Sequence, residues 1–193
     1  IYAGAIDAVF GTADASQFIP YGISGASGQQ QSPVLSAFNQ LLSLPESRFY
    51  VDEIVALLDC EAIRNRFALT FEDVAKIRQW CQEIHIRWGL SAQDKAALGL
   101  PAIEANSWRA GLDRLLLGYA LPLTSDEGEW QLFDGQLGFD GMTGEQATTM
   151  AQLCAFVDCL DRFRKKLKRK YKAADWQQQL LAVLGAFFKP SHD

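Results

Sequence analysis

The hydrophobic positions along this chain recur mainly every three to four residues, and this spacing predicts helices. One predicted helix begins at Pro33 after the capping residue Ser32, and another begins at Phe71 after Thr70. Asp73 lies three residues after Thr70 and completes a capping box with aspartate in place of glutamate. Further helices are expected at residues 2–10, 50–58, 91–98, 106–119, 145–171 and 174–188, with a short turn at 61–67.

Two of these segments are expected to place particular side chains in the core. The helix after Thr70 is expected to bury a stripe that starts at Phe71 and continues through Val74, Ile77, Cys81 and Ile84. The helix at 106–119 is expected to be capped by Asn106 and to bury Trp108. The segment 145–171 is the longest helix, ~40 Å at ~1.5 Å per residue.

Two parts of the chain lack the helical period. Residues 18–23 form a short apolar run bounded by proline and glycine, which predicts a strand, and residues 25–31 are predicted to form a loop. Residues 121–144 are acidic, contain five glycines and show no sustained period, so we expect the longest loop there. The predicted fold is therefore mainly α, with six to eight helices and at most one or two strands near the N-terminus.

Composition narrows the class of protein. The chain has 193 residues, of which 49% are hydrophobic and 21% charged, as in an ordinary globular domain. No apolar run reaches the ~18 residues of a membrane helix, and no signal peptide is visible, so we expect no membrane association. The four cysteines lack short paired spacings and are expected to be reduced, which favours a cytoplasmic location. The first residue is Ile1 rather than methionine, which suggests a piece of a longer protein.

Positive charge is concentrated in one segment. Eight of the eleven residues from 162 to 172 are basic; the net charge of the chain is −5, this segment contributes +8, and the rest carries −13. Two interpretations remain open, a solvated helix end whose cations suit the macrodipole, and a surface that binds phosphates or an acidic protein. The candidate DNA-binding cations, expected on the outer face, are Arg164, Lys165, Lys168, Arg169 and Lys172.

The tryptophans raise the possibility of base stacking. Trp88, expected at a helix end beside Arg87, is the candidate for an exposed stacking or interface residue. Trp130 lies in the acidic segment, which repels nucleic acid, and Trp108 and Trp176 fall on apolar stripes. Burial in the core or in an interface is the favoured interpretation for all four.

Catalytic patterns are missing from the sequence. Gly22, Gly25 and Gly28 are loosely spaced and no lysine follows them, so they do not form a phosphate loop. The carboxylates near Glu129 lie in a glycine-rich, solvated segment, and His85 has no partner arrangement for a catalytic base. We therefore expect no catalytic residue, no metal site and no cofactor in this chain.

Several short motifs share their order and spacing with one family. Two centre on tryptophan: Ile-His-Ile-Arg-Trp-Gly-Leu at residues 84–90, and a segment beginning Asn-Ser-Trp-Arg-Ala-Gly-Leu at residues 106–112. In these motifs the chain resembles the RecC-type gamma subunits of exodeoxyribonuclease V, whereas Gly25 and residues 123–144 depart from that pattern. The supporting motifs are Ile-Pro-Tyr-Gly-Ile-Ser at 19–24, Ser-Pro-Val-Leu-Ser-Ala-Phe at 32–38, Leu-Pro-Glu-Ser-Arg-Phe at 44–49, Val-Ala-Leu-Leu at 55–58 and Leu-Gly-Ala-Phe-Phe at 184–188.

The resemblance implies a fold and a function. Such a subunit resembles a superfamily-1 helicase without ATP-binding motifs, so residues 1–31 would flank a RecA-like fold and residues 32–193 would form a helical, 2B-like accessory domain. The implied role is non-catalytic: handling a double-stranded DNA end or fork and assembling with the motor-nuclease (beta) and second motor (alpha) subunits in the bacterial cytoplasm. ATP and metal chemistry would belong to those other subunits. The alternative is a free-standing helical protein-interaction or regulatory domain without DNA binding.

Overall fold

The structure is a computed structural model that describes residues 32–121, 124 and 129–189. The chain divides into two units, Ile1–Ser36 and Ala37–Asp193, and the following description concerns the second unit and the start of the helix that leads into it. The helix, strand and loop predicted at 2–10, 18–23 and 25–31 lie outside the described residues. So does the Ile-Pro-Tyr motif at 19–24.

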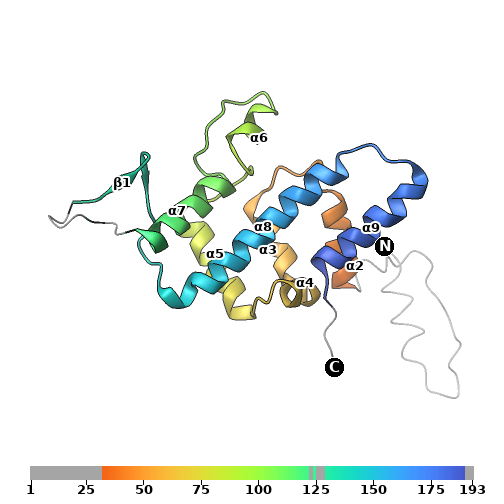
Figure 1. Ribbon diagram of the computed structural model, residues 1–193, viewed down its shortest axis with the longest axis horizontal. Coiled ribbons are helices and arrows are strands. Elements are labelled where there is room, and N and C mark those ends of the chain that lie inside the picture. The colour runs from red at the N-terminus through yellow and green to blue at the C-terminus, as the bar shows by residue number, and fades with distance from the viewer. Residues whose placement is uncertain (1–31, 122–123, 125–128, 190–193) are drawn as a thin grey trace, which may run out of the picture. The chain divides into compact units, whose positions relative to one another are not determined.

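The described chain is mainly helical, as predicted (Figure 1). Its only sheet within the described ranges has two short strands. The elements are α2 (Pro33–Leu42), α3 (Val51–Ala56), η2 (Leu57–Asp59), α4 (Glu61–Arg66), α5 (Phe71–Glu83), α6 (Ala92–Ala96), α7 (Trp108–Ala120), β1 (Leu132–Phe133), β2 (Gln136–Leu137), η3 (Gly144–Gln146), α8 (Ala147–Leu167) and α9 (Ala173–Phe187).

The helix starts follow local capping chemistry. Thr70 and Asp73 form the predicted capping box: the Thr70 side chain accepts a hydrogen bond from the Asp73 N–H at 3.1 Å, and the Asp73 carboxylate accepts one from the Thr70 N–H at 2.8 Å. The prediction that Asn106 caps α7 is wrong by one residue. Ser107 is the cap, because its hydroxyl accepts from the Ala110 N–H at 3.1 Å, whereas Asn106 has a left-handed φ of 63°.

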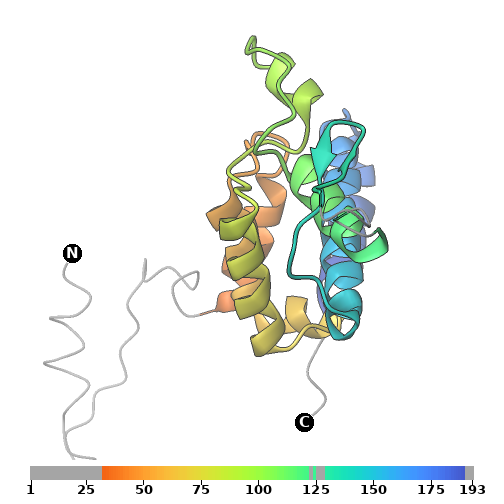
Figure 2. The same ribbon diagram turned by 90° about the vertical axis from the view of Figure 1, so that its left-hand side faces the viewer.

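The core lies between two groups of helices. Figure 2 shows α5 with α3 on one side and α8 with α9 on the other, and α8 contacts α5, α7 and α9. Trp80 and Trp108 are fully buried there, which confirms the prediction for Trp108. The stripe of α5 is buried from Val74 onward and includes Trp80, but Phe71 is 71% exposed because the helix begins beyond the edge of the core.

Residues 121–144 contain a hairpin that was expected to be loop. β1 and β2 pair antiparallel through a turn at Asp134 and Gly135, whose φ angles of 51° and 73° are both left-handed. An Asp-Gly pair between short apolar segments is a strong signal for such a turn. The hairpin packs on α7, where Arg114 Nε donates to the Leu137 carbonyl at 3.1 Å and the Phe139 N–H donates to the Arg114 carbonyl at 2.8 Å.

The long helix α8 is shorter than predicted. It begins at Ala147 instead of residue 145 and ends at Leu167 instead of residue 171. The chain then turns, and α9 begins at Ala173. Residues 168–172 therefore connect the two helices. The basic residues between 162 and 172 lie partly at the end of α8 and partly in this connection.

Candidate nucleic-acid interface

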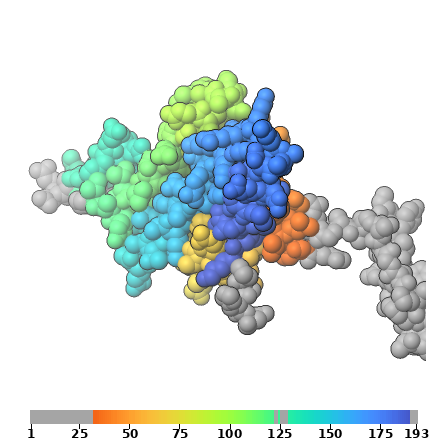
Figure 3. All heavy atoms as spheres, turned by 45° about the vertical axis from the view of Figure 1, so that its right-hand side comes forward, coloured from red at the N-terminus to blue at the C-terminus, as the bar shows by residue number. Residues whose placement is uncertain are grey.

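The basic residues predicted as a DNA-binding set occupy the last turn of α8 and the connection to α9. We call residues 162–172 the basic segment. Figure 3 shows this region beside α6 at one end of the second unit. The C-terminus of α8 favours positive charge because of the helix macrodipole, and Arg164, Lys165 and Lys166 stand in its last turn. Lys168 is the C-cap of α8, and the effect of the dipole falls off beyond the last turn, so it does not account for Lys170 and Lys172.

Arg164 is not an outer cation, contrary to the prediction. Its side chain is only 11% exposed, and Nη1 lies 2.7 Å from Oδ1 of Asp94 in α6. Its guanidinium also lies 4.9 Å from the ring centroid of Phe49. Leu160 precedes Arg164 by four residues and is buried, so the same helical period places Arg164 over the core. Arg164 thus connects α8 with α6 and with the segment before α3.

The other four predicted cations face solvent. Lys165 is 71% exposed and pairs with Asp161 at 2.5 Å, one turn earlier in α8. Lys168, Arg169 and Lys172 are exposed. Lys165 and Lys168 also line a hollow of about 520 Å³ between α6 and α8, together with Arg109 of α7. This end of the domain can therefore present several cations to a polyanion.

Trp88 and Arg87 lie in a segment held by backbone hydrogen bonds to a distant part of the chain. The expectation that Trp88 ends a helix is wrong, because α5 ends at Glu83. The Arg87 carbonyl accepts from the Val51 N–H at 3.0 Å, and the Gly89 N–H donates to the Arg48 carbonyl at 2.9 Å. These bonds hold the segment against the start of α3.

The Trp88 ring is half-buried between two neighbours. Its centroid lies 6.4 Å from that of Tyr50, with the ring planes tilted by 39°. Lys95 Nζ lies 5.2 Å from the centroid of the Trp88 ring. Tyr50 is 42% exposed. Tyr50 and Lys95 were not singled out from the sequence, since only the fold brings them to Trp88.

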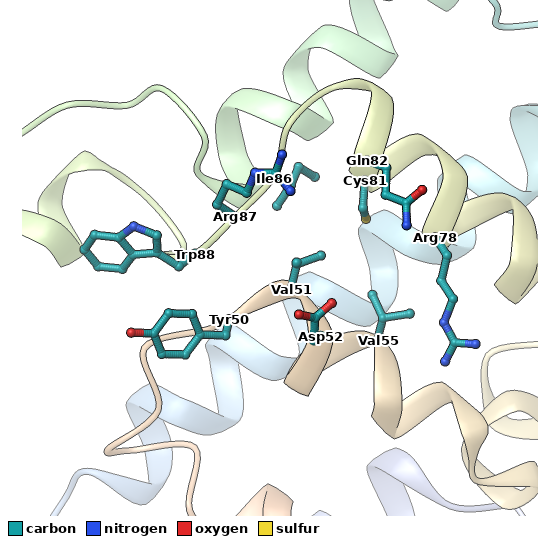
Figure 4. Close-up of a pocket in the computed structure, with 10 residues that line it drawn as sticks. All are labelled: Tyr50, Val51, Asp52, Val55, Arg78, Cys81, Gln82, Ile86, Arg87 and Trp88. Carbon is teal, nitrogen blue, oxygen red and sulfur yellow. The ribbon is translucent and has the colours of Figure 1, made fainter.

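A cleft of about 490 Å³ opens beside these rings, between α3 and the end of α5 (Figure 4). Tyr50 and Trp88 lie at one end of it, and Arg78 lies at the other, where it forms a two-oxygen ion pair with Asp59 at 2.8 Å. Aromatic faces beside arginines are the groups with which proteins hold single-stranded nucleic acid.

The thiol that lines this cleft is chemically quiet. Burial raises the pKa of Cys81 to about 12, and the negative charge of Asp52 adds to the effect. The nucleophilic thiolate is therefore scarce near neutral pH. Among the described residues, no group of three or more His, Cys, Asp or Glu side chains could hold a metal ion. Within the same ranges, no helix combines the length and apolarity needed to span a membrane.

These features describe a helical domain with a cationic end and an aromatic cleft. Residues 31–193 match the family described as RecBCD enzyme subunit RecC fourth domain. The RecBCD enzyme subunit RecC of Escherichia coli (strain K12) is 40% identical over 189 residues, which cover 98% of this chain and 16% of that protein. The chain belongs to the RecC family, as its motifs indicated.

Two further relatives carry the same description. The RecC subunit of Haemophilus influenzae is 32% identical over 194 residues, covering 100% of this chain and 16% of that protein. The RecC subunit of Buchnera aphidicola subsp. Acyrthosiphon pisum is 28% identical over 188 residues, covering 97% of this chain and 17% of that protein. The chain thus spans about a sixth of the length of these relatives.

Proposed function

We propose that this chain is a non-catalytic domain of a RecC subunit that contributes to DNA fork handling and subunit assembly in a RecBCD enzyme. In this proposal residues 1–31 flank a RecA-like fold and residues 32–193 form a helical 2B-like accessory domain. Its partners are the motor-nuclease and second motor subunits and a double-stranded DNA end or fork in the bacterial cytoplasm. ATP hydrolysis and DNA cleavage belong to the other subunits.

The observation that carries the DNA part is the set of exposed cations beyond the end of α8. Lys168, Arg169 and Lys172 are exposed on a chain whose remainder outside the basic segment has a net charge of −13. At ~0.1 M salt electrostatic interactions are screened beyond ~10 Å, so the acidic remainder weakens this local attraction little. Lysine and arginine that replace counterions on phosphates make binding depend strongly on salt.

The cleft beside Trp88 offers a second contact. A base displaced from the duplex would stack on the ring of Tyr50, which is exposed beside Trp88, while Arg87 is exposed next to the rings. This part concerns single-stranded DNA, whereas the basic segment suits any backbone phosphate. The two contacts therefore predict different substrate preferences.

The proposal is tested in the complete three-subunit enzyme. The variant Lys168→Ser, Arg169→Ser, Lys172→Ser removes three exposed cations and leaves the Arg164–Asp94 ion pair intact. We expect weaker binding of forked DNA ends and a slope of log affinity against log salt that is smaller by up to about 3, because each lost phosphate contact reduces it by roughly 0.9. Size-exclusion chromatography reports assembly separately.

A matched control removes the same charge elsewhere. The variant Arg66→Ser, Lys76→Ser, Lys189→Ser alters three side chains away from the basic segment, on α4, on α5 and in the segment after α9. It should leave both the affinity and the salt slope unchanged. If the two variants bind forked DNA equally well, the basic segment is only a solvated helix end and the DNA part of the proposal is wrong.

A further inference from the structure

A groove runs between α7, α8 and the β1–β2 hairpin, and it shares Leu90, Arg109 and Asp161 with the hollow beside the basic segment. It consists of two adjoining hollows of about 170 Å³ and 500 Å³. Asp113 and Leu116 of α7 line both hollows, so they form one continuous depression. All of these residues belong to the second unit.

The groove is apolar at its base and along its wall. Leu112 of α7 and Val157 of α8 are buried and line the smaller hollow. Leu116 is 42% exposed and Leu132 of the hairpin is 64% exposed. Exposed apolar side chains that gather along one depression and are rimmed by polar groups mark a protein-binding surface.

The rim of the groove is acidic. Asp158 and Asp161 stand along the smaller hollow, Asp134 stands at the larger one, and Asp113 stands between them. Arg109 is the one cation among the residues that line the two hollows. A polynucleotide would be repelled here, so the charge of the groove favours a cationic protein segment.

Two oxygen acceptors at the groove lack donors. Oδ1 of Asp161 and Oε1 of Gln136 are buried without a hydrogen-bond partner among the described residues. Burial also raises the pKa of Asp113, and Glu104 adds to this shift, while the charge of Arg109 opposes it. A lysine or arginine placed beside Asp113 would favour its ionised carboxylate.

The groove is held in shape by tight contacts. A Cβ atom on Gly118 of α7 would lie 2.1 Å from the Phe139 carbonyl oxygen, so this glycine allows the chain after β2 to lie directly on the helix. Arg114 fastens the same segment through its bond to the Leu137 carbonyl. The leucines and carboxylates are therefore positioned before any partner arrives.

We propose that this groove binds an amphipathic helix of a partner protein, one that carries lysine or arginine beside its apolar stripe. The apolar stripe lies on Leu116 and Leu132, and the cations meet Asp113 and Asp158. A helix laid in a hydrophobic groove is a common mode of protein recognition. This inference rests on the assembly part of the proposed function and names the surface and the chemistry that it uses.

Photo-crosslinking in the reassembled three-subunit enzyme tests the occupant. A benzophenone amino acid replaces Leu116 or Leu132, and the matched control position is Leu181 of α9, which is 59% exposed. We expect both groove positions to crosslink to one peptide of a partner subunit that contains at least two lysines or arginines at helical spacing. Crosslinks to DNA, to a second copy of this chain, to an uncharged segment or to nothing overturn the proposal.

Charge reversal tests the chemistry. Asp134→Lys combined with Asp158→Lys should lower the crosslink yield roughly tenfold, because like charges facing each other oppose association. Reversing the cations of the crosslinked peptide should restore the yield. The control, Glu83→Lys combined with Glu72→Lys on α5, should leave it unchanged. A yield that does not respond to Asp134→Lys with Asp158→Lys, or no rescue, shows that the acidic rim does not select the partner.

Two further measurements separate this proposal from the DNA proposal. The thermal midpoint shows whether each variant folds, and the milder pair Asp134→Asn with Asp158→Asn replaces the lysine variant if that variant unfolds. In the fraction of enzyme that still assembles, the groove variants should show the wild-type slope of log affinity for forked DNA against log salt. If the groove variants lose the salt slope of DNA binding while the crosslink persists, the two surfaces do not have separate roles and the division between them is wrong. If the variant at Lys168, Arg169 and Lys172 does not weaken DNA binding, only the DNA proposal fails, and the groove proposal stands.

Discussion

At the scale of single residues, Trp108 joins three parts of the chain that are distant in sequence. Its ring is fully buried, and Nε1 donates to the Phe49 carbonyl at 3.1 Å. Its backbone N–H donates to the Gly89 carbonyl at 3.0 Å. The start of α7 is thereby held against the segment before α3 and the segment after α5.

Replacing Trp108 with alanine should lower the free energy of unfolding by ~3–5 kcal/mol, because it leaves a cavity and an unpaired carbonyl. Chemical denaturation monitored by circular dichroism measures this change. Trp130, which is 57% exposed, provides the control, and Trp130→Ala should have a small effect. An unchanged denaturation midpoint for Trp108→Ala would contradict the observed burial.

Arg164 and Arg169 belong to the same basic segment, but Arg164 contributes to the fold whereas Arg169 is exposed to solvent. Arg164→Ala should lower the free energy of unfolding by about 1–3 kcal/mol, because it leaves Asp94 without its charged donor. Arg169→Ala should change stability little, since its side chain is exposed. Comparison of the two denaturation midpoints checks this, and equal midpoints would show that the Arg164 ion pair contributes nothing to the fold.

At the scale of elements, the packing between α7 and the hairpin depends on a missing side chain. Alanine is usually favoured over glycine inside a helix by roughly 1 kcal/mol. At Gly118 that gain is opposed by the Phe139 backbone, which a Cβ atom would overlap, whereas at Gly185 in α9 nothing lies within 4 Å. The surroundings of each glycine therefore decide the sign of the same substitution.

We expect Gly185→Ala to raise the free energy of unfolding by up to about 1 kcal/mol and Gly118→Ala to lower it. Thermal denaturation of both variants measures the difference. Gly118→Ala should also increase hydrogen exchange of the Phe139 N–H, which bonds to the Arg114 carbonyl. Stabilisation by both substitutions would mean that the hairpin does not lie on α7 as the structure shows.

The capping box of α5 predicts a pH dependence. Burial opposes ionisation of Asp73, but hydrogen bonds from Thr149 and Thr70 outweigh this and hold the pKa of Asp73 below its ordinary value of 3.8. The ionised carboxylate therefore contributes stability above the unfolded pKa, and this contribution is lost as the pH falls through the folded pKa. Asp73→Asn should flatten the acid-side loss of stability.

Thermal midpoints measured from about pH 6 down to pH 3 test this expectation. The exposed neighbour Glu72, in the same helical turn, provides the control, and Glu72→Gln should leave the slope nearly unchanged. Thr70→Ala should lower stability by about 1 kcal/mol near neutral pH by removing the other half of the capping box. Parallel pH curves for the wild type and Asp73→Asn would refute the role of the carboxylate.

At the scale of the whole molecule, opposite charges are segregated within the second unit. The basic segment comprises the end of α8 and the connection to α9, whereas Asp113, Asp134 and Asp158 surround the groove beside α7. One surface suits a polyanion and the other suits a cationic protein segment. This division agrees with a domain that contacts both DNA and another subunit, as we propose.

The chain by itself should neither hydrolyse ATP nor cut DNA. Its sequence has no phosphate loop, and the described residues provide no metal-binding group of side chains. Phosphate release and cleavage of a labelled duplex, each measured with magnesium, should not exceed the buffer background. Turnover by purified protein that persists through repeated chromatography would show that the chain contains a catalytic site.

The sequence by itself determined the helical class, the Thr70–Asp73 capping box, the burial of Trp108 and the family. These features depend on spacings of three or four residues or on short motifs, so they can be recognised without knowing the fold. The turn at Asp134 and Gly135 carried the same kind of local signal and could have been identified.

Only the tertiary structure decided which side chains meet across the chain. Arg164 and Asp94 are 70 residues apart, and Trp88 and Tyr50 are 38 apart, so no local pattern pairs them. The groove likewise needs α7, α8 and the hairpin to be in place before its leucines and carboxylates form one surface. A basic residue on a helix can point to solvent or cover the core, and the neighbouring elements determine which occurs because they provide its charged partner and exclude water around it.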